Sequence, residues 1–398
     1  MHRRTFLSSA AMCAALPLTG KLSAAAAVKG RRTAAVIGHT GRGNYGHGLD
    51  SVWKLVPDMD IVGVADASES GLKSELRKLD LTAGGNTDYG KMLAECRPEF
   101  VSVCPRYADQ HCDMVLAAID AGVKGIYVEK PFVRTPEEAD RILAAAQKQG
   151  TKIAVAHRNA WHPALKVIAD AIANGDLGII REIRGRGKGD RRGGAEDLWV
   201  LGTHVFNLME FFGGIAQTCS AELLQDGRPV TAADVRDGAE GLGPLAGNEL
   251  HARYRLAGGI TATFDSIAND GFSNAGFGLQ LVGTKGLVNI QVDVDPVAYF
   301  VPGNPFAPTK ADRPWIPVSS AGIGVPEKQP ERIAEVHNHV AAVTDLIRCC
   351  DSKAQPVCDA HAAARTVDMV CAVFESHRQE GRTVSLPLTE RRNPLTLL

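Results

Sequence analysis

A lysine at the end of an apolar run is the residue whose type and position most clearly suggest chemistry. The segment Gly125–Val128 is short and apolar, as a buried parallel strand is, and Glu129, Lys130 and Pro131 follow it directly. Ligands collect beyond the carboxyl ends of strands in open α/β sheets, and a proline cannot continue a ladder. We therefore expect Lys130 to stand on a rigid turn at a ligand-binding edge, where a lysine can serve catalysis.

A glycine-rich loop near the start of the chain suggests a dinucleotide site. The apolar run 33–37 has the character of a buried strand. Glycines after such a strand let backbone N–H groups approach a pyrophosphate at a helix N-terminus. The literal G-x-G-x-x-G match begins at Gly41, but Gly38 directly follows the strand, so we favour the register that begins there. The cofactor contacts predicted in this loop are Gly38, Thr40, Gly41, Arg42 and Gly43.

Asp66 ends the next predicted strand, Met59–Asp66, about one βαβ unit after the glycines. An acid at that position bonds the ribose hydroxyls of NAD, and its charge repels the additional phosphate of NADP. The alternative is a helix N-cap, which the sequence Asp66–Glu69 would suit. The preceding glycine loop favours the cofactor role, with NAD preferred over NADP.

The elements that must position these residues alternate between strands and helices. Apolar runs at 99–105 and 152–156 are further expected strands, and helices are expected over 110–121 and 136–149. The second of these helices has proline at its first position and ends at Gly150. This alternation predicts a doubly wound parallel sheet.

The second half of the chain has a different pattern. Runs at 250–256, 261–264 and 278–283 alternate apolar and polar residues, as strands with one solvated face do. The segment 283–287 is expected to form a hairpin turn. The expected helices are 164–174, 199–212, 333–347 and 360–377, and the expected loop, rich in proline and glycine, is 302–331.

Taken together, these motifs resemble the glucose–fructose oxidoreductase / inositol dehydrogenase (Gfo/Idh/MocA) family. The resemblance runs from about Thr33 into the C-terminal half and is weakest beyond Gly214. It implies an α/β Rossmann domain at residues 29–156 and an α+β domain at 157–398 with an open, mostly antiparallel sheet. That sheet often forms the dimer interface, so a homo-oligomer is expected. The matching pieces are the glycine loop, Asp66, Pro105–His111, Val128–Pro131 and Gly202–His204.

The resemblance also implies catalytic roles. Hydride transfer from an alcohol carbon needs a base for the hydroxyl proton. The resemblance places Lys130 in or beside that role, with Glu129 supporting its turn, and makes His204 the substrate histidine. Members that oxidise polyols commonly carry Asp one helical turn before the histidine, where this chain has Val200, and Asp197 is nearly two turns away. This departure weakens the case for a plain inositol-type dehydrogenase. The further cofactor contacts implied are Pro105, His111, Glu129 and Lys130.

Candidate substrate contacts follow the last Rossmann strand and precede the histidine helix. Trp161 and His162 suit a polyol, because aromatic faces and fixed donors bind sugars. The basic run 181–192 is mostly expected to be a solvated strand and loop, with Lys188 contacting an acidic sugar as a hypothesis. The predicted contacts are Arg158, Trp161, His162, Lys188, Thr203 and His204.

The first 28 residues have the pattern of an export signal. Arg3 and Arg4, the mild apolar stretch 8–18 and the small residues 23–27 follow the order of a bacterial twin-arginine signal. The alternative is an ordinary basic N-terminus with a short helix. We expect a periplasmic or secreted protein, exported already folded.

Composition excludes several classes of function. A formal net charge of -1 gives no global attraction to nucleic acid or anionic membrane, and no apolar segment is long enough to span a bilayer. The nine cysteines show no framework or metal-site spacing, so most are expected to be buried hydrophobes, and no metal is predicted.

Three functions remain open. The first is an exported NAD(P)-dependent oxidoreductase acting on a carbohydrate or cyclic polyol with tightly held NAD. The second, also within the resemblance, is an NAD-dependent glycosidase that uses transient oxidation and elimination. The third is a binding protein on a dehydrogenase scaffold, because a fold does not settle function.

Overall fold

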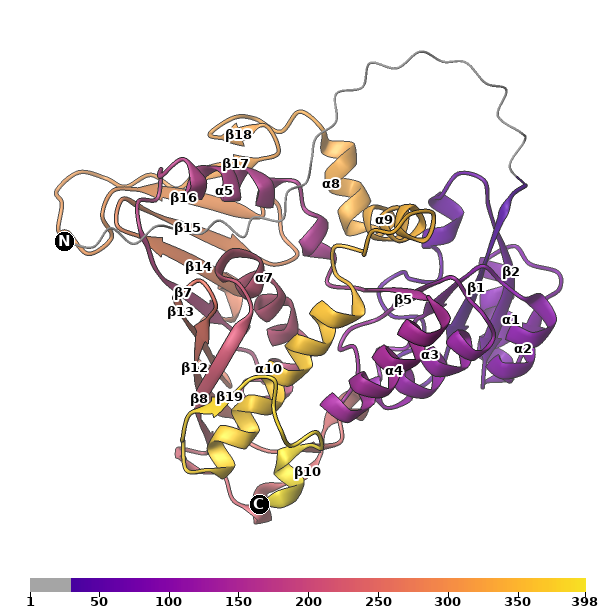
Figure 1. Ribbon diagram of the computed structural model, residues 1–398. Helices are drawn as coiled ribbons and strands as arrows, with labels where there is room; N and C mark the ends of the chain where they lie inside the picture. Colours follow the sequence, from indigo (N-terminus) through magenta and orange to yellow (C-terminus); the bar gives the residue numbers. More distant parts are fainter. Residues whose placement is uncertain (1–29) are drawn as a thin grey trace. The chain divides into compact units, whose positions relative to one another are not determined.

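Six parallel strands form the N-terminal sheet. The computed structural model describes residues 30–398, so the predicted export signal at residues 1–28 lies outside the described part. The strand order is β3-β2-β1-β4-β5-β6 with every pair parallel, which confirms the predicted doubly wound sheet (Figure 1). The strands are β1 (Arg32–Gly38), β2 (Met59–Asp66), β3 (Gly85–Asn86), β4 (Phe100–Val103), β5 (Gly125–Val128) and β6 (Lys152–Val155).

The helix that follows β5 has the predicted bounds. The side chain of Thr135 accepts a hydrogen bond from the N–H of Glu138 at its start, and Gly150 ends it in the left-handed region. This helix, α4, lies beside α3 on the sheet (Figure 1). The helices of this half are α1 (Glu69–Lys78), α2 (Tyr89–Cys96), α3 (His111–Asp120) and α4 (Pro136–Gln149), with the short turns η1 (Val52–Leu55) and η2 (Ala108–Gln110).

The loop after β1 differs from the prediction, because no α-helix follows it. Residues 40–51 form successive turns before η1. Gly46 and Gly48 have φ angles of 63° and 97°, which a right-handed helix cannot contain. The loop therefore lacks the helix N-terminus at which the prediction placed the pyrophosphate.

A helix from the C-terminal half covers one face of the N-terminal sheet. Alternate strand residues point to opposite faces, and Val36 and Tyr127 lie in a buried cluster with Trp53 and Val343. Val343 belongs to α9 (Val340–Cys350). The chain therefore returns to the Rossmann domain after residue 157, and residues 32–398 form one compact unit.

The C-terminal sheet has eleven strands and is mostly antiparallel, as the resemblance implied. Its order is β18-β17-β16-β15-β14-β7-β13-β12-β8-β19, with β9 paired to β8, and only β7 and β13 are parallel neighbours. The expected 283–287 turn joins β14 to β15. Its strands are β7 (Ile180–Arg186), β8 (Ala216–Gln225), β9 (Arg228–Pro229), β12 (Glu249–Leu256), β13 (Thr261–Ile267), β14 (Gly278–Gly283), β15 (Gly286–Gln291), β16 (Ala298–Pro302), β17 (Ile316–Ser319), β18 (Gly322–Ile323) and β19 (Val384–Ser385); β10 (Arg236–Asp237) and β11 (Pro244–Leu245) pair separately.

Three C-terminal expectations need correction. Strands β17 and β18 lie inside the stretch 302–331 that composition predicted as loop. The helix expected over 333–347 is two helices, α8 and α9, separated at His339, whose φ is 67°. The helix carrying His204 begins with a π-helical turn, η4. The helices are α5 (Ala164–Ala173), α6 (Ala195–Asp197), η4 (Leu198–Gly202), α7 (Thr203–Gly213), α8 (Pro330–His337), α9 and α10 (Ala360–Arg378), with short turns η3 (Arg158–Trp161), η5 (Ala232–Asp234), η6 (Ala239–Gly241), η7 (Ser273–Ala275) and η8 (Pro394–Leu397).

The cysteines of the described residues are all free thiols, and most are buried. No cluster of metal-ligating side chains was found within residues 30–398. In the same residues, no helix combines the length and apolar character needed to cross a bilayer.

Candidate active site

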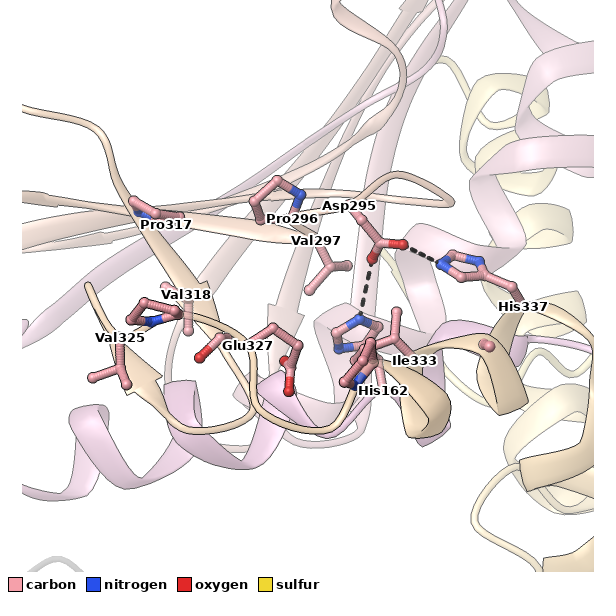
Figure 2. A pocket seen from close by; sticks show the side chains of 14 residues that line it. His162, Asp295, Pro296, Val297, Pro317, Val318, Val325, Glu327, Ile333 and His337 are labelled. Atoms are coloured by element: carbon pink, nitrogen blue, oxygen red, sulfur yellow. Dashed lines mark hydrogen bonds and ion pairs between the residues drawn. The ribbon is translucent and has the colours of Figure 1, made fainter.

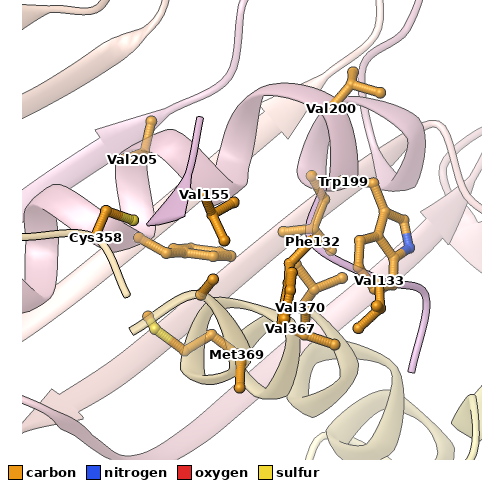
Figure 3. Close-up of a cluster of buried hydrophobic side chains, with 14 of the residues drawn as sticks. Phe132, Val133, Val155, Trp199, Val200, Val205, Cys358, Val367, Met369 and Val370 are labelled. Carbon is orange, nitrogen blue, oxygen red and sulfur yellow. The ribbon is translucent and has the colours of Figure 1, made fainter. Parts of the chain in front are cut away.

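Lys130 stands on a turn beyond the carboxyl end of β5, as predicted. It is 8% exposed, and its Nζ donates a hydrogen bond to the carbonyl oxygen of Val200, 3.1 Å away. The Lys130–Pro131 peptide bond is cis. Phe132 and Val133 follow and are buried beside Trp199 (Figure 3). Core packing therefore holds the lysine turn against η4, the turn that precedes His204.

Glu129 supports this turn from a fully buried position. Its Oε1 lies 2.7 Å from Nδ1 of His47 and 4.0 Å from Nζ of Lys130. Burial raises the pKa of the carboxyl, but the hydrogen bond to His47 and the charge of Lys130 outweigh it, so its pKa lies below the usual value. Glu129 is therefore a carboxylate that balances the charge of Lys130.

His204 is buried next to Lys130 and a second imidazole. It is 5% exposed, and its ring meets that of His157 edge to face at a centroid distance of 5.2 Å. Burial lowers the pKa of His204 well below its usual value, and burial together with Lys130 lowers that of His157 to about 3. Both rings are therefore neutral at neutral pH, and each has one nitrogen that can accept a hydrogen bond.

Asp293 is a charged group of this site that sequence reasoning missed. It lies in the turn between β15 and β16 at a φ of 65°, and its Oδ1 accepts hydrogen bonds from Nε of Arg158 (2.9 Å) and Nδ2 of Asn159 (2.8 Å). Burial opposes its ionisation, but electrostatic coupling to His204 and the hydrogen bond with Arg158 hold its pKa below the usual value. In turn its charge raises the pKa of His204, so the two are electrostatic neighbours.

No pattern in the sequence marks Asp293. Acids are common in turns between strands, and its partners lie more than 130 residues earlier in the chain. Arg158, by contrast, was a predicted substrate residue, and the structure places it in the site through this contact.

Several buried polar atoms around Glu129 and Lys130 have no hydrogen-bond partner within the described residues. Such orphans are rare in folded proteins and mark the place of a ligand or water. A hydroxyl-rich molecule suits them, because each hydroxyl both donates and accepts. His339 belongs to the same group: its Nδ1 lies 2.6 Å from the hydroxyl of Tyr127, and burial lowers its pKa to about 4. The orphan atoms are Glu129 Oε2, His157 Nε2, His204 Nδ1 and His339 Nε2.

Asp66 lines a cavity of about 380 Å³ beyond the carboxyl ends of β1 and β2, together with Gly38. Its carboxylate accepts hydrogen bonds from the backbone and hydroxyl of Thr40, the hydroxyl of Tyr45 and the backbone of Ser68. Burial raises its pKa, yet these bonds prevail and the pKa is lowered. The cavity and its acid fit the adenosine end of NAD, although internal donors already contact Asp66.

Backbone amides of the glycine loop donate hydrogen bonds to other groups of the same loop. The N–H groups of His39 and Arg42 donate to carbonyls within the loop, and that of Gly41 donates to the side chain of Asn44. Arg42 pairs with Asp109. A side chain at Gly43 would collide with the backbone after β4. The loop therefore packs against the segment after β4. Its amides bond within the loop, whereas the prediction expected them to point at the phosphates of a cofactor.

His111, a predicted cofactor contact, is buried and fastens two turns together. Its Nε2 lies 2.6 Å from the carbonyl oxygen of Pro105, and its Nδ1 lies 2.9 Å and 3.1 Å from those of Pro131 and Phe132. Since both ring nitrogens face backbone carbonyls, His111 positions the lysine turn and has no nitrogen left for a ligand.

Two predicted substrate residues have structural partners. Nε1 of Trp161 donates to Oδ2 of Asp345 on α9, 3.0 Å away. The hydroxyl of Thr203 is buried and donates to the carbonyl of Trp199, 3.3 Å away, within the helix. Neither side chain therefore offers its polar group to the Lys130 site.

Lys188 and His162 are each engaged in another contact. Nζ of Lys188 is 3.9 Å from Asp190 on a half-exposed loop, and His162 lines a different cavity. Oδ2 of Asp197 accepts from the hydroxyl of Ser266 and the backbone of Lys188, whereas its Oδ1 is buried without a partner in the described chain. Burial raises the pKa of Asp197 to about 6.

Comparison with known proteins agrees with this geometry. Residues 32–157 match the GFO_IDH_MocA family, described as an oxidoreductase family with an NAD-binding Rossmann fold. A D-apiose dehydrogenase of Paraburkholderia graminis is 27% identical over 126 residues, which are 32% of this chain and 33% of that protein. A levoglucosan dehydrogenase of Pseudarthrobacter phenanthrenivorans is 25% identical over 202 residues, or 45% and 52% of the two chains.

The fold of the whole described unit has solved counterparts. A levoglucosan dehydrogenase in complex with NADH and levoglucosan superposes with a TM-score of 0.69 over 89% of this chain and 99% of that one, at 17% identity. The sequence matches span only a third to a half of the curated relatives' length. The family match covers the domain that carries Asp66 and Lys130. Residues 32–157 thus match the NAD-binding Rossmann fold of the Gfo/Idh/MocA oxidoreductase family, which the chain resembles in this domain.

Proposed function

We propose that this protein is an NAD-dependent oxidoreductase acting on a neutral carbohydrate or cyclic polyol. The observation that carries the proposal is that the buried Lys130 and His204 lie together beyond β5, with the partly exposed Asp293 as an electrostatic neighbour of His204. This is the edge of a Rossmann sheet where ligands bind. When bound there, NAD accepts the hydride from the alcohol carbon.

The proton of the alcohol is assigned to His204. Its ring is neutral, and its Nδ1 is buried without a partner in the described chain, so it is free to accept. Lys130 donates to the carbonyl of Val200, and its positive charge stabilises the negative charge that develops on the substrate oxygen. Asp293 stabilises His204 once it is protonated. Lys130 thus stabilises the substrate oxygen while His204 serves as the base.

NAD is favoured over NADP because Asp66 lines the cavity assigned to adenosine. Its lowered pKa keeps the carboxylate charged at neutral pH. A charged acid at this position accepts from ribose hydroxyls and repels a 2′-phosphate.

The substrate is proposed to be neutral because the charges of the site already balance. Lys130 lies beside Glu129, and Arg158 is paired with Asp293. The imidazoles between them are neutral. A uronic acid would bring a carboxylate to a site with no unpaired cation among these groups, at a large desolvation cost.

A substrate panel tests the proposal. Purified protein is incubated with NAD⁺ and with neutral compounds such as levoglucosan, D-apiose and inositols, in parallel with uronic acids. NADH absorbance is expected with a neutral compound and not with the acids. Turnover of uronic acids alone would contradict the neutral assignment. Release of a chromogenic aglycone from aryl glycosides without lasting NADH would instead select the elimination mechanism of a glycosidase.

Export and assembly complete the proposal. Arg3 and Arg4 support export through the twin-arginine pathway, and their replacement by lysine is expected to retain the protein in the cytoplasm. Free nicotinamide cofactor is scarce outside the cytoplasm, so turnover there requires NAD to stay bound and a second sugar to reoxidise it.

A homo-oligomer through the C-terminal sheet is supported by the exposed Phe272 and Trp315, which line a cavity with Arg186 of β7.

A further inference from the structure

A second cavity lies in the C-terminal half and shares none of its lining residues with the Lys130 site. Its volume is about 560 Å³, within the range of small-molecule sites. Strand β17, helix α8 and the segments before β16 and α8 form its walls. Most of this wall is aliphatic, and its members include Pro296, Val297, Pro317, Val318, Val325 and Ile333 (Figure 2).

One end of this cavity is polar. Asp295 lies between two imidazoles, with its Oδ2 at 2.6 Å from Nε2 of His337 and its Oδ1 at 3.6 Å from Nε2 of His162 (Figure 2). The second distance is too long for a hydrogen bond. The carboxylate is therefore bonded on one side and leaves a gap on the other.

His162 bounds this gap with a buried donor, its Nε2. The side chain of His162 is 3% exposed, and its Nδ1 accepts a hydrogen bond from the backbone N–H of Ala164 at 3.2 Å. Burial lowers the pKa of His162, so the ring is neutral and carries its proton on Nε2. Nε2 has no hydrogen-bond partner within the described residues. A buried donor thus stands next to an oxygen of the half-exposed Asp295 carboxylate at the cavity wall.

A hydroxyl group completes this pair. It accepts one hydrogen bond and donates another, so one oxygen serves both His162 and Asp295. An ammonium cannot accept from His162, and an anion is repelled by Asp295. Glu327, the other acid of the wall, is committed to its own loop, because its oxygens accept from Ser320 and from the backbone of Lys328. The polar selectivity of the cavity therefore rests on the His162–Asp295 gap.

We propose that this cavity is a binding site for a small neutral alcohol with an apolar body, whose hydroxyl accepts from His162 Nε2 and donates to Asp295 Oδ1. The aliphatic wall takes the apolar body, and a water molecule alone would leave that wall unfilled. The proposal goes beyond the oxidoreductase function and does not depend on it, because the site requires neither NAD nor Lys130.

Four ligands of similar shape test which polar group the cavity prefers. Benzyl alcohol, toluene, benzylamine and benzoate are titrated into the full chain without sugar or cofactor, and dissociation constants are measured by ligand-observed NMR. Benzyl alcohol is expected to bind about tenfold more tightly than toluene and than either charged probe. Equal affinity for the alcohol and toluene, or no binding of any probe at millimolar concentration, would overturn the proposal.

Two substitutions on α8 test whether the alcohol binds in this cavity. Ala334 is exposed and lines the cavity, whereas its neighbour Glu335 is exposed and is not among the lining residues. Ala334→Phe is expected to fill the cavity and abolish benzyl alcohol binding, and Glu335→Phe is expected to leave it unchanged. Asp295→Ala is expected to lose the tenfold preference for the alcohol while toluene still binds. Unchanged binding in Ala334→Phe would place the alcohol elsewhere and overturn the assignment.

Discussion

Nζ of Lys130 donates a hydrogen bond to the main-chain carbonyl of Val200, 3.1 Å away. Val200 stands where related polyol dehydrogenases are expected to carry an aspartate, and it contributes a backbone oxygen in its place. Its carbonyl lies in the π-helical turn η4, an irregularity that is frequent at functional sites. Lys130 is thus held without a side-chain acid from the helix that carries His204. The negative charge near His204 comes from Asp293, which lies on another element.

Loss of the Lys130 ammonium should reduce turnover without preventing folding or cofactor binding. Lys130→Met keeps the length of the side chain and removes the charge that stabilises the developing alkoxide, so kcat is expected to fall about 10²–10⁴-fold. Steady-state kinetics with the best neutral sugar measure the change.

Lys188→Met is the matched control for this substitution. The Lys188 ammonium lies near Asp190 on a half-exposed loop, so its loss is expected to change kcat/KM by less than about threefold. A large effect at Lys188 and none at Lys130 would mean that the wrong lysine has been assigned.

Removing the charge of Asp293 should weaken His204 as a base. The carboxylate raises the pKa of His204, so Asp293→Asn is expected to lower kcat about 10–100-fold. The acid limb of the pH–rate profile is expected to move to lower pH. The other charged groups that act on His204 are Lys130 and Arg158, which remain in the variant. A lower Tm with an unmoved pH profile would reduce Asp293 to a structural role.

Asp66 should decide between the two nicotinamide dinucleotides. Asp66→Ala is expected to raise the Kd for NAD about 10–100-fold and to reduce the preference over NADP, because charged hydrogen bonds to the ribose are lost. Isothermal titration with each dinucleotide measures both. Tyr45→Phe is the control, since it removes one donor to Asp66 and keeps the acceptor. An unchanged preference in Asp66→Ala would show that the ribose binds elsewhere.

Stability should fall as the pH drops below about 6.5. The pKa of His157 is about 3 and that of His339 about 4 in the folded protein. The unfolded chain therefore binds more protons in this window, and each imidazole costs about 1.4 kcal/mol per pH unit.

Asp197 acts in the opposite direction, because its raised pKa of about 6 adds stability at low pH that is lost as the pH rises through 6. Burial raises the pKa of Glu75 to about 8, so this carboxyl acts in the same direction as Asp197. Burial also lowers the pKa of His162 and of His204, so four imidazoles oppose these two carboxyls and outweigh them.

Urea unfolding between pH 7 and pH 4.5 measures this dependence. His157→Gln is expected to flatten it. His251→Gln is expected to steepen it, because hydrogen bonds to Asp265 and Glu249 outweigh partial burial and raise the pKa of His251. Its charged form therefore contributes stability at low pH that is lost as the pH rises through its folded pKa. Equal slopes in the parent and His157→Gln would contradict the assignment of a neutral buried imidazole.

The local parts of the fold were predictable from the sequence. Period-two alternation, the Pro136 and Gly150 punctuation of α4 and the apolar run of β5 are all encoded by neighbouring residues. These features placed Lys130 at the end of its strand. The remainder of the site depends on contacts between distant residues, which local patterns do not report.

Two departures show what local patterns leave out. The loop after β1 contains the fingerprint glycines, yet Gly46 and Gly48 adopt positive φ and prevent the helix that normally follows. Asp293 enters the site because the β15–β16 turn meets Arg158 and Asn159 across the fold. Neither backbone handedness at a glycine nor a partner more than 130 residues away is visible in a short stretch of sequence.

The most direct test of the central claim is the cofactor that the native protein holds. The purified chain is denatured, and the released small molecules are identified and quantified by mass spectrometry. About one NAD(H) per chain is predicted, with the oxidised form converted to NADH when a neutral sugar substrate is added before denaturation. A protein that releases no nicotinamide dinucleotide and does not bind added NAD would contradict the account.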